Sequence, residues 1–378
     1  MQVMSVAVCL VANTISYPEG GGHFWVHLNW ALGLRSCGCD VIWLEVLDER
    51  IAPERVEACV QSLKSRLAPY GLVQALAICT RNCDAPHEAA RGCRGFDAAM
   101  EADLAINVLY TLPAKLIKRL RRSAFLDIDP GLLQLFVTQG LMPLEKHDLY
   151  FTIGETVGTP QAKFPDAGVR WQHTLPCVAL DWWPVHVAAE GAPFTTVSHW
   201  YSGGWVKDAD ELYCNYKREG FLPFLDLPQR VRQPLELALC LGEDEEERAA
   251  LEQRGWRVRE AWEVAGSPED YQRYIQGSRG EFSCVKPSCV RLQNAWISDR
   301  TLCYLASGKP ALVQHTGPSK FLPDDEGLFR FRDLPQAVRG LETIADDYER
   351  QSRLARVLAE QLFDARKVVN RLLERSLA

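Results

Sequence analysis

The stretch WISDRTLCYLASGKPALVQHTG, residues 296–317, decides which fold the chain adopts. Apolar residues recur at helical spacing from 299 to 306, and Gly308 followed by Pro310 ends that helix. The short apolar run at 311–313 is typical of a strand that is covered on both faces. This order of helix, tight turn and buried strand predicts one unit of an open parallel sheet. In such sheets, ligands bind in the loops after the carboxyl ends of the strands.

Similar units recur along the whole chain. Apolar runs bounded by turn residues predict strands at 5–13, 40–46, 75–80, 102–110, 125–131, 148–160, 194–200, 234–242 and 281–286. Helical periodicity and capping signals predict helices at 23–35, 53–67, 114–122, 131–139, 216–227, 243–255, 267–276, 334–346 and 347–378.

Two of the strands open similar cycles roughly one domain length apart, because each is followed by a glycine-rich turn. This repetition predicts an α/β protein with two Rossmann-like domains that face each other across a cleft. We expect an amino-terminal domain at 1–188, a carboxyl-terminal domain at 189–360 and a final helix at 361–378. The hinge is expected near 184–192, where proline and glycine interrupt the periodicity.

The composition is that of a folded protein: 378 residues, 47% hydrophobic and 24% charged. The net charge of −7 argues against broad binding of nucleic acids or anionic membranes. No apolar run approaches the roughly 18 residues that a membrane span needs. The amino-terminus has neither a basic region nor a cleavage site, so we expect a cytoplasmic protein whose 13 cysteines are reduced. The group Cys79, Cys83, His87 and Cys93 fits no common zinc spacing, and no metal site is expected there.

The segment from Ala306 to Pro310 closely resembles the donor-nucleotide region of glycosyltransferases with the GT-B fold. The usual pattern in that family is Glu-Ala-x-Ala-x-Gly-x-Pro-Val. The Glu that commonly holds the ribose hydroxyls falls here at Cys303, which cannot accept hydrogen bonds as a carboxylate does. Asp299 lies one helical turn earlier on the same face and offers replacement oxygens. A narrower resemblance is to poorly characterised bacterial GT-B-like proteins that carry SDR-x-x-CYLASG-(K/R)-P-x-LVQ-x-TG, in which Cys303 is the norm.

The resemblance implies a nucleotide-sugar donor, such as a UDP-sugar, and no metal. Its diphosphate would meet backbone N–H groups and a cation. The donor-binding residues expected on this basis lie in glycine-rich turns, near the strand at 281–286 and in the organising stretch. They are Gly21, Gly22, Ser202, Gly203, Gly204, Arg279, Lys286, Asp299, His315, Thr316 and Gly317. An ordinary flexible loop explains the first glycines equally well, and a surface turn explains Arg279.

Three residues are expected to carry out the chemistry on the acceptor side: His23, Asp127 and Glu155. His23 stands at the start of a helix, where it is a candidate base or simply a capping residue. Asp127 and Asp129 point to the same side of a strand end. This pair also resembles the Asp-x-Asp metal site of the GT-A fold, and an N-cap is the structural alternative.

We expect a metal-independent glycosyltransferase that moves a sugar to a small-molecule, glycan or peptide acceptor. One alternative is an inactive GT-B-like protein that binds nucleotide or glycan; another is a sugar-nucleotide epimerase or phosphorylase. Nucleic acid is not an expected partner. Tryptophans gather near the hinge and the loop that follows it, at 182–183, 200 and 205. They suit either stacking on sugar rings or packing between the domains.

Overall fold

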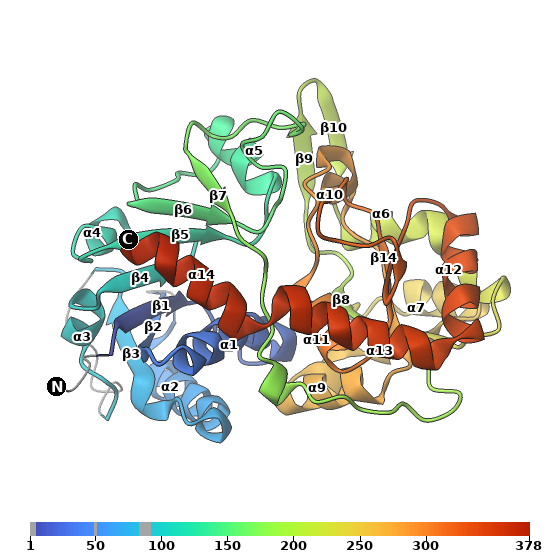
Figure 1. Cartoon of the computed structure of the whole chain (residues 1–378), viewed down its shortest axis with the longest axis horizontal. Coiled ribbons are helices and arrows are strands. Elements are labelled where there is room, and N and C mark those ends of the chain that lie inside the picture. Colours follow the sequence, from blue (N-terminus) through green and yellow to red (C-terminus); the bar gives the residue numbers. More distant parts are fainter. Residues whose placement is uncertain (1–4, 49–50, 83–91) are drawn as a thin grey trace.

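The computed structural model describes residues 5–48, 51–82 and 92–378 and contains two separate seven-stranded sheets (Figure 1). The first sheet has the order β3-β2-β1-β4-β5-β6-β7, and all of its pairings are parallel. Its strands are β1 (Ala7–Ala12), β2 (Asp40–Leu47), β3 (Leu76–Thr80), β4 (Leu104–Asn107), β5 (Ser123–Asp127), β6 (Leu149–Thr152) and β7 (Trp171–His173). The accompanying helices are α1 (Gly21–Ser36), α2 (Pro53–Leu67), α3 (Phe96–Met100), α4 (Ala114–Ile117) and α5 (Leu132–Thr138). We call this part the first lobe.

The second sheet has the order β12-β11-β8-β13-β14-β16-β15, and only its edge strand β15 is antiparallel. Its strands are β8 (Phe194–His199), β11 (Leu235–Cys240), β12 (Arg257–Glu260), β13 (Gly280–Ser283), β14 (Ala311–Gln314), β15 (Asp325–Glu326) and β16 (Leu328–Phe331). A separate hairpin consists of β9 (Trp205–Asp208) and β10 (Glu211–Cys214). We call this part the second lobe.

The helices after β10 are α6 (Lys217–Phe221), α7 (Glu245–Gln253), α8 (Ala261–Ala265), α9 (Pro268–Gly277), α10 (Pro287–Leu292), α11 (Asp299–Ala306), α12 (Leu334–Asp346), α13 (Tyr348–Leu358) and α14 (Ala365–Leu377). The helix expected from 347 to the end is therefore interrupted, because a π-helical turn at Ala359–Phe363 separates α13 from α14. The strands β7, β12, β15 and β16, the helices α3, α8 and α10, and the β9–β10 hairpin were not expected from the sequence.

The two parallel sheets have the same internal topology. When the parallel strands of each lobe are numbered along the chain, the second lobe reads 3-2-1-4-5-6, the order of the Rossmann fold, and the first lobe reads the same with β7 added as a seventh strand at the edge. The central strand β1 is largely buried, as a parallel strand covered by helices on both faces is, and β8 is buried over its first half and becomes accessible towards its carboxyl end. The expected architecture of two Rossmann-like domains is confirmed.

Two chain crossings join the lobes side by side (Figure 1). The first is the linker between β7 and β8, and the second is the turn between α13 and α14. They are hydrogen-bonded to each other, since Val178 N donates to Phe363 O (2.8 Å) and Ala365 N donates to Val178 O (3.0 Å). Beyond this crossing, α14 packs on α1, where Gly33 lies against Val369.

The interface between the lobes is tightly packed near the linker. Trp183 is fully buried, with its ring centroid 4.7 Å from that of Trp25 in the first lobe and 6.3 Å from that of Tyr271 in the second. The tryptophans therefore divide into two groups, since Trp183 and Trp200 are fully buried whereas Trp205 is 65% exposed.

The sequence predicted no metal site in the cysteine-rich group and no membrane-spanning segment. Cys83 and His87 of the cysteine-rich group lie outside the described residues, and the described part of the chain holds no group of three or more potential metal ligands. Among the described helices, none combines the length and the apolar character that crossing a bilayer requires.

Candidate active site

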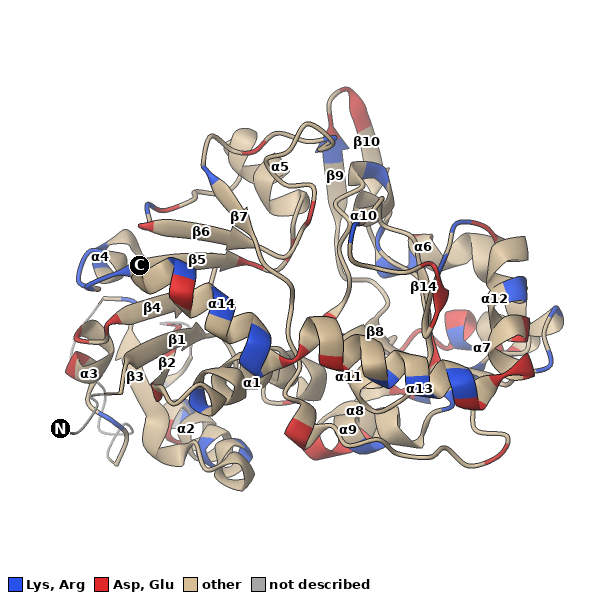
Figure 2. Cartoon of the chain, viewed as in Figure 1, with Lys and Arg blue, Asp and Glu red and all other residues tan. Residues whose placement is uncertain are grey.

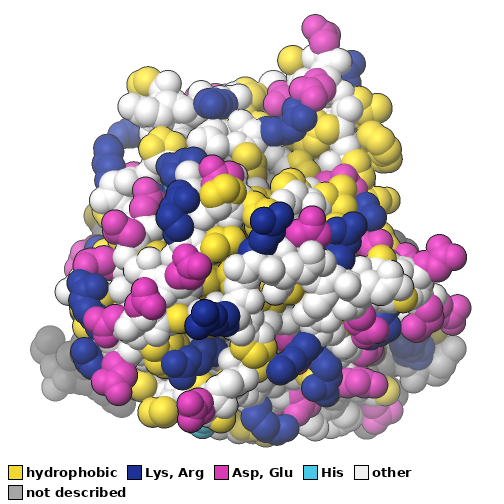
Figure 3. All heavy atoms as spheres, turned by 90° about the vertical axis from the view of Figure 1, so that its right-hand side faces the viewer, with side chains coloured by type: hydrophobic (Ala, Val, Ile, Leu, Met, Phe, Trp, Pro, Cys, Tyr) yellow, Lys and Arg dark blue, Asp and Glu magenta, His cyan; other side chains and the backbone are white. Residues whose placement is uncertain are grey.

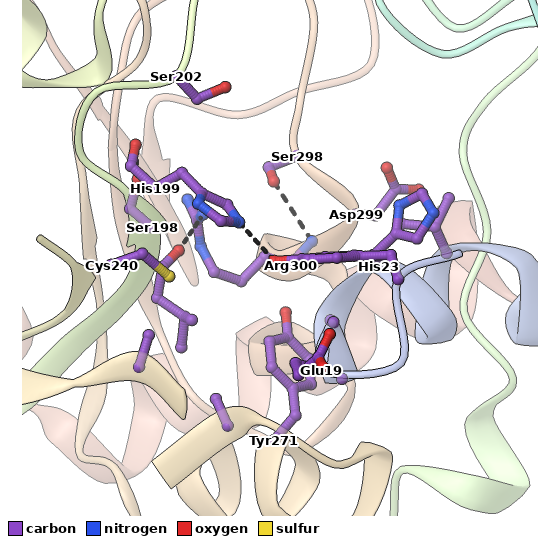
Figure 4. Close-up of a pocket in the computed structure, with 18 of the residues that line it drawn as sticks. Glu19, His23, Ser198, His199, Ser202, Cys240, Tyr271, Ser298, Asp299 and Arg300 are labelled. Carbon is purple, nitrogen blue, oxygen red and sulfur yellow. Dashed lines mark hydrogen bonds between the residues drawn. The ribbon is translucent and has the colours of Figure 1, made fainter. Parts of the chain in front are cut away.

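A cleft of about 290 Å³ lies between the lobes (Figure 4). It is formed by the turn before α1 in the first lobe and by the carboxyl ends of β8, β11 and β13 in the second. Its lining residues are Tyr17, Glu19, Gly20, Gly21, Gly22, His23, Val26, Val197, Ser198, His199, Ser202, Lys217, Cys240, Ala261, Trp262, Ala265, Tyr271, Lys286, Ser298, Asp299 and Arg300.

The topology explains why the cleft lies here. In the second sheet, the chain leaves the central strand β8 in one direction to reach β11 and in the other to reach β13. The connections therefore diverge at the carboxyl ends of β8 and β13, and ligands of doubly wound sheets bind at such a switch point. His199 ends β8, and Lys286 follows β13.

The glycine turn of the first lobe contacts the second lobe directly. A Cβ atom on Gly21 would lie 2.3 Å from Ser267 O, and one on Gly22 would lie 2.7 Å from the Tyr271 ring. These glycines therefore allow the start of α1 to approach α8 and α9 while they line the cleft. Close contact between the lobes is a sufficient reason for glycine at both positions.

His23, the residue after these glycines, lines the cleft and is fixed by the backbone of the first lobe. Its Nε2 lies 2.5 Å from the carbonyl oxygen of Asn13. Because a carbonyl oxygen only accepts, Nε2 donates this hydrogen bond, and in the neutral ring Nδ1 is then the nitrogen with the lone pair that a base needs.

A hydrogen bond spans the cleft beside His23. Tyr17 Oη of the first lobe lies 2.6 Å from His199 Nε2 of the second, and the Trp262 ring packs edge-on against both. Burial lowers the pKa of His199, and the charge of Lys286 lowers it further. His199 is therefore neutral near pH 7 and holds the two lobes together through Tyr17.

Lys217 is the most unusual charged group of the cleft. The residue is only 8% exposed and lines the cleft, and no hydrogen bond or ion pair joins its Nζ atom to another described residue; this atom is not among the fully enclosed unpartnered atoms and so faces the cleft. Burial lowers the pKa of this amine to about 7, and the nearby Arg300 and Lys286 lower it further. A buried cation without a partner carries a desolvation cost that an anionic ligand would offset.

Arg300 also lines the cleft, but it is committed to the protein. Its Nε donates to Glu281 Oε1 at 2.8 Å, and its other nitrogens donate to Val197 O and Ser283 Oγ. Glu281 is completely buried. This ion pair holds α11 against β13 and β8 and leaves the two lysines as the cations available to a ligand.

The amino-terminus of α11 points at the same region. Ser298 is its N-cap and accepts a hydrogen bond from Arg300 N. The N–H groups of the first turn and the helix dipole favour an anion at this position.

Asp299 lies in this first turn and lines the cleft, whereas Cys303 does not. The Cys303 side chain is buried near Asn29 of the first lobe. Burial raises the pKa of Asp299 to about 6, so its carboxylate is mostly ionised at pH 7 and is able to accept hydrogen bonds from hydroxyl groups.

Arg279 is not placed to bind a diphosphate in this cleft. It precedes the first residue of β13, at the opposite end of the sheet, and its guanidinium lies over the Tyr348 ring at 3.4 Å from the centroid. The structure therefore places Arg279 away from the cleft, because its position along the strand, which the sequence leaves open by a few residues, decides which edge of the sheet it joins.

The end of the organising stretch is also outside the cleft lining. His315 Nδ1 accepts a hydrogen bond from Gly317 N, and Thr316 Oγ1 donates to Trp296 O. A Cβ on Gly317 would lie 2.6 Å from Gln293 O. This turn is therefore filled by the protein's own backbone, and the expected phosphate contacts of His315, Thr316 and Gly317 do not fit its geometry.

Asp127 is a structural carboxylate. It is completely buried and accepts hydrogen bonds from Gln134 Nε2 and Thr152 Oγ1, both at 2.8 Å, and from Asp129 N at 3.0 Å. Tyr110 Oη donates to it as well. With its oxygens occupied in this way, Asp127 is not among the residues that line the cleft.

Glu155 connects the lobes at another place. Its carboxylate accepts hydrogen bonds from Ser319 Oγ at 2.5 Å and from Lys320 N at 2.9 Å. It is absent from the cleft lining and serves to dock the two lobes, so it does not fit the expected role of a base.

The glycines of the loop after β8 serve the hairpin. Ser202 lines the cleft, but Gly203 and Gly204 do not. Gly203 has a φ of +142°, and a Cβ there would lie 2.0 Å from Asn215 O. These two glycines bring the chain into the β9–β10 hairpin and do not form a phosphate loop.

The structure thus brings together Gly21, Gly22, His23, Ser202, Lys286 and Asp299 of the expected site residues. It adds cleft residues that were not expected, of which Tyr17, Glu19, His199, Lys217, Trp262 and Arg300 carry polar or aromatic groups. No local pattern marks Lys217, since its burial depends on how α6 packs under β13.

Comparison with known proteins supports the fold. No family model and no curated protein sequence matches the chain. Solved structures with the GT-B fold match it over nearly its whole length. They include a sucrose-phosphate synthase from Thermosynechococcus elongatus (12% identity, TM-score 0.58, covering 98% of this chain and 99% of that chain).

Two further neighbours have nucleotides bound. HepE from Anabaena, in complex with UDP and glucose, matches with 12% identity and a TM-score of 0.56 over 98% of this chain and 99% of that chain. An alpha-glucosyltransferase in complex with UDP and DNA matches with 10% identity and a TM-score of 0.63 over 98% of this chain and 99% of that chain. The protein therefore has the GT-B fold.

Proposed function

We propose that the protein is a metal-independent glycosyltransferase that uses a nucleotide-sugar donor. The observation that carries the proposal is Lys217, a largely buried lysine that lines the cleft at the switch point of the second sheet and has no hydrogen-bond partner among the described residues. The solved neighbours with UDP bound share the fold and support the same class of ligand.

The leaving diphosphate would lie between the two lysines and the start of α11. Lys217 and Lys286 line the cleft from different elements, and the α11 amino-terminus completes the anion site. Charge that develops on the departing diphosphate is stabilised by such prearranged cations and N–H groups, and this is the role that a metal plays elsewhere. The Asp299 carboxylate would accept hydrogen bonds from the ribose hydroxyls.

The acceptor would approach from the first lobe. His23 is the one expected catalytic residue that lines the cleft, so we assign it the role of removing the proton from the acceptor hydroxyl. Its Nδ1 is the basic nitrogen because Nε2–H is held by Asn13 O. The Tyr17–His199 hydrogen bond lies beside the anion site, and the donor phosphates would compete with Tyr17 for His199.

The experiment is thermal melting with UDP, GDP, dTDP and ADP, followed by hydrolysis of the corresponding nucleotide-sugars. We expect one nucleotide to raise the melting temperature and its sugar nucleotide to be hydrolysed slowly. The variant Lys217→Met should lose the shift, and His23→Ala should keep the shift but lose turnover.

The alternatives give different results. A shift without turnover in the wild-type protein would identify a binding protein, and an isomerised sugar or dependence on free phosphate would identify an epimerase or a phosphorylase. If no nucleotide changes the melting temperature, the proposed function is refuted.

A further inference from the structure

The two walls of the cleft differ in charge. Among the described cleft residues of the first lobe, Glu19 is the only Asp, Glu, Lys or Arg. The charged residues on the wall of the second lobe are Lys217, Lys286, Asp299 and the paired Arg300. That wall is cationic overall and suits the anionic donor. In the proposed reaction, the acidic wall of the first lobe is therefore the one that faces the acceptor.

The turn that carries Glu19 is preformed. Tyr17 N donates to Thr14 O at 3.2 Å, and Gly20 N donates to Tyr17 O at 3.3 Å. Glycine is required at position 20, because a Cβ there would clash with the Tyr17 ring. The centroid of this ring lies 5.7 Å from that of His23, the proposed base. Glu19 and His23 thus border the cleft from one ordered segment (Figure 4).

The Glu19 carboxylate is available to a ligand. The residue is exposed, and no hydrogen bond or ion pair joins its side chain to another described residue. Burial raises the pKa of Tyr17 to about 12, with smaller contributions from Cys240 and from the charge of Glu19, so the carboxylate lies near this phenol. Arg66 does not line the cleft, and its pKa, which burial lowers, responds more to the buried Glu45 than to Glu19.

The surroundings of Glu19 favour a cation as its partner. The Trp262 ring is 41% exposed and lies edge-on to Tyr17, with 6.2 Å between the centroids. An ammonium group paired with a carboxylate also gains from contact with such rings. Glu269 and Asp270 stand in the first turn of α9 (Figure 2), which begins where Gly21 meets the second lobe, and they add negative charge at this side. One outer face of the molecule, in contrast, mixes acidic and basic side chains (Figure 3) and offers no large field of a single sign.

We infer that Glu19 selects the acceptor by its charge. It favours acceptors that carry an ammonium group close to the reacting hydroxyl and disfavours acceptors that carry a carboxylate or a phosphate there. This inference rests on the proposed function and narrows the acceptor class to cationic hydroxy compounds. An acid before a helix also interacts favourably with the helix dipole, and Glu19 precedes Gly20, the N-cap of α1. That interaction leaves the carboxylate oxygens free and predicts no selection of ligands.

The test measures the binding of three small alcohols that differ in charge: serinol carries an ammonium group, glycerol is neutral and glycerate carries a carboxylate. Each is titrated into the wild-type protein by ligand-observed NMR, with and without saturating UDP. We expect serinol to bind about tenfold more tightly than glycerate, with glycerol between them. Glu19→Gln should remove this preference, and Glu19→Asp, which keeps the charge, should retain most of it. Glu190→Gln, which neutralises an exposed acid of the linker, is the matched control and should bind the three alcohols as the wild type does.

The outcomes separate this inference from the simpler roles of Glu19 and from the proposed function. Loss of the preference in Glu19→Gln with unchanged UDP binding supports the inference. It is refuted if serinol binds the wild-type protein no more tightly than glycerate does. It is also refuted if the preference survives in Glu19→Gln while the melting temperature changes, as a role in the dipole of α1 alone predicts, or if Glu190→Gln loses the preference equally. The titrations without UDP test Glu19 independently of the donor, whereas failure of UDP to bind the wild-type protein refutes the proposed function whatever the alcohols show.

Discussion

Replacement of Lys217 by Met changes both stability and ligand binding in ways that depend on pH. The amine has a pKa of 10.5 when it is free in solution, and burial lowers this pKa to about 7 in the folded protein. The unfolded chain therefore binds more protons than the folded protein between these two values. Stability from this group accordingly rises as the pH increases from about 7 towards 10.5.

The size of the effect follows from the two pKa values. The lowered pKa of Lys217 reduces the free energy of unfolding by about 4 kcal/mol at pH 7 and by about 3 kcal/mol at pH 8, because each pKa unit corresponds to about 1.4 kcal/mol. The wild-type protein should thus gain about 1 kcal/mol of stability between these pH values relative to Lys217→Met. The variant should also be the more stable protein at pH 7, since Met carries no charge into the interior.

Nucleotide binding should show the opposite dependence. A diphosphate favours the charged amine, so binding takes up a proton, and this uptake becomes more costly as the pH rises above 7. The dissociation constant for UDP should increase about fivefold between pH 7 and pH 8. In the Lys217→Met variant, UDP binding should be much weaker, and the increase of the dissociation constant between pH 7 and pH 8 should be absent.

The assays are urea denaturation and calorimetric titration with UDP at pH 7, 8 and 9. Proton uptake is measured directly by repeating the titration in buffers of different ionisation enthalpy. Lys163→Met removes an exposed lysine and serves as the control that should follow the wild-type curves. The reasoning is refuted if the wild type and Lys217→Met have parallel stability curves, or if UDP binds without taking up a proton.

Three further predictions test other parts of the site. Asp299→Asn should weaken UDP binding about tenfold but leave 2′-deoxy-UDP binding nearly unchanged. Calorimetry with both ligands measures the two affinities, and equal losses would contradict the proposed contact between Asp299 and the ribose. Gly21→Ala should force the lobes apart and destabilise the protein by about 2 kcal/mol or more, whereas Gly277→Ala, where the new methyl group meets open space, should not; equal melting temperatures would contradict this. Arg279→Ala should lower stability by about 1 kcal/mol through lost stacking on Tyr348 and leave the affinity for UDP unchanged, so a weakened affinity would restore its donor role.

The order of elements was largely readable from local sequence. The apolar runs of β1 and β8 and the capped helix α11 stand out because each is a short-range pattern that does not depend on distant parts of the chain. The weaker elements were missed for the same reason. β7 and β12 lie at the edges of the sheets and are partly exposed, so their sequences lack a clear apolar run.

The candidate site was only partly predictable. The glycine-rich turns after β1 and β8 led to His23 and Ser202, and the resemblance to GT-B glycosyltransferases led to Asp299 and Lys286. The structure places all four residues around the cleft. Residues that were expected only because of their chemical type do not all line the cleft. Asp127 has the right chemistry, but its oxygens are occupied by neighbours that come from other elements.

The amino-acid sequence by itself determined that the chain forms two successive βα cycles, because hydrophobic periodicity and glycine turns act over a few residues. Only the tertiary structure decided which polar groups meet in the cleft. The free amine of Lys217, the pairing of Arg300 with Glu281 and the bridge from Tyr17 to His199 each depend on contacts between segments far apart in the chain. Burial and the filling of hydrogen-bonding capacity are properties of those contacts, and no short stretch of sequence encodes them.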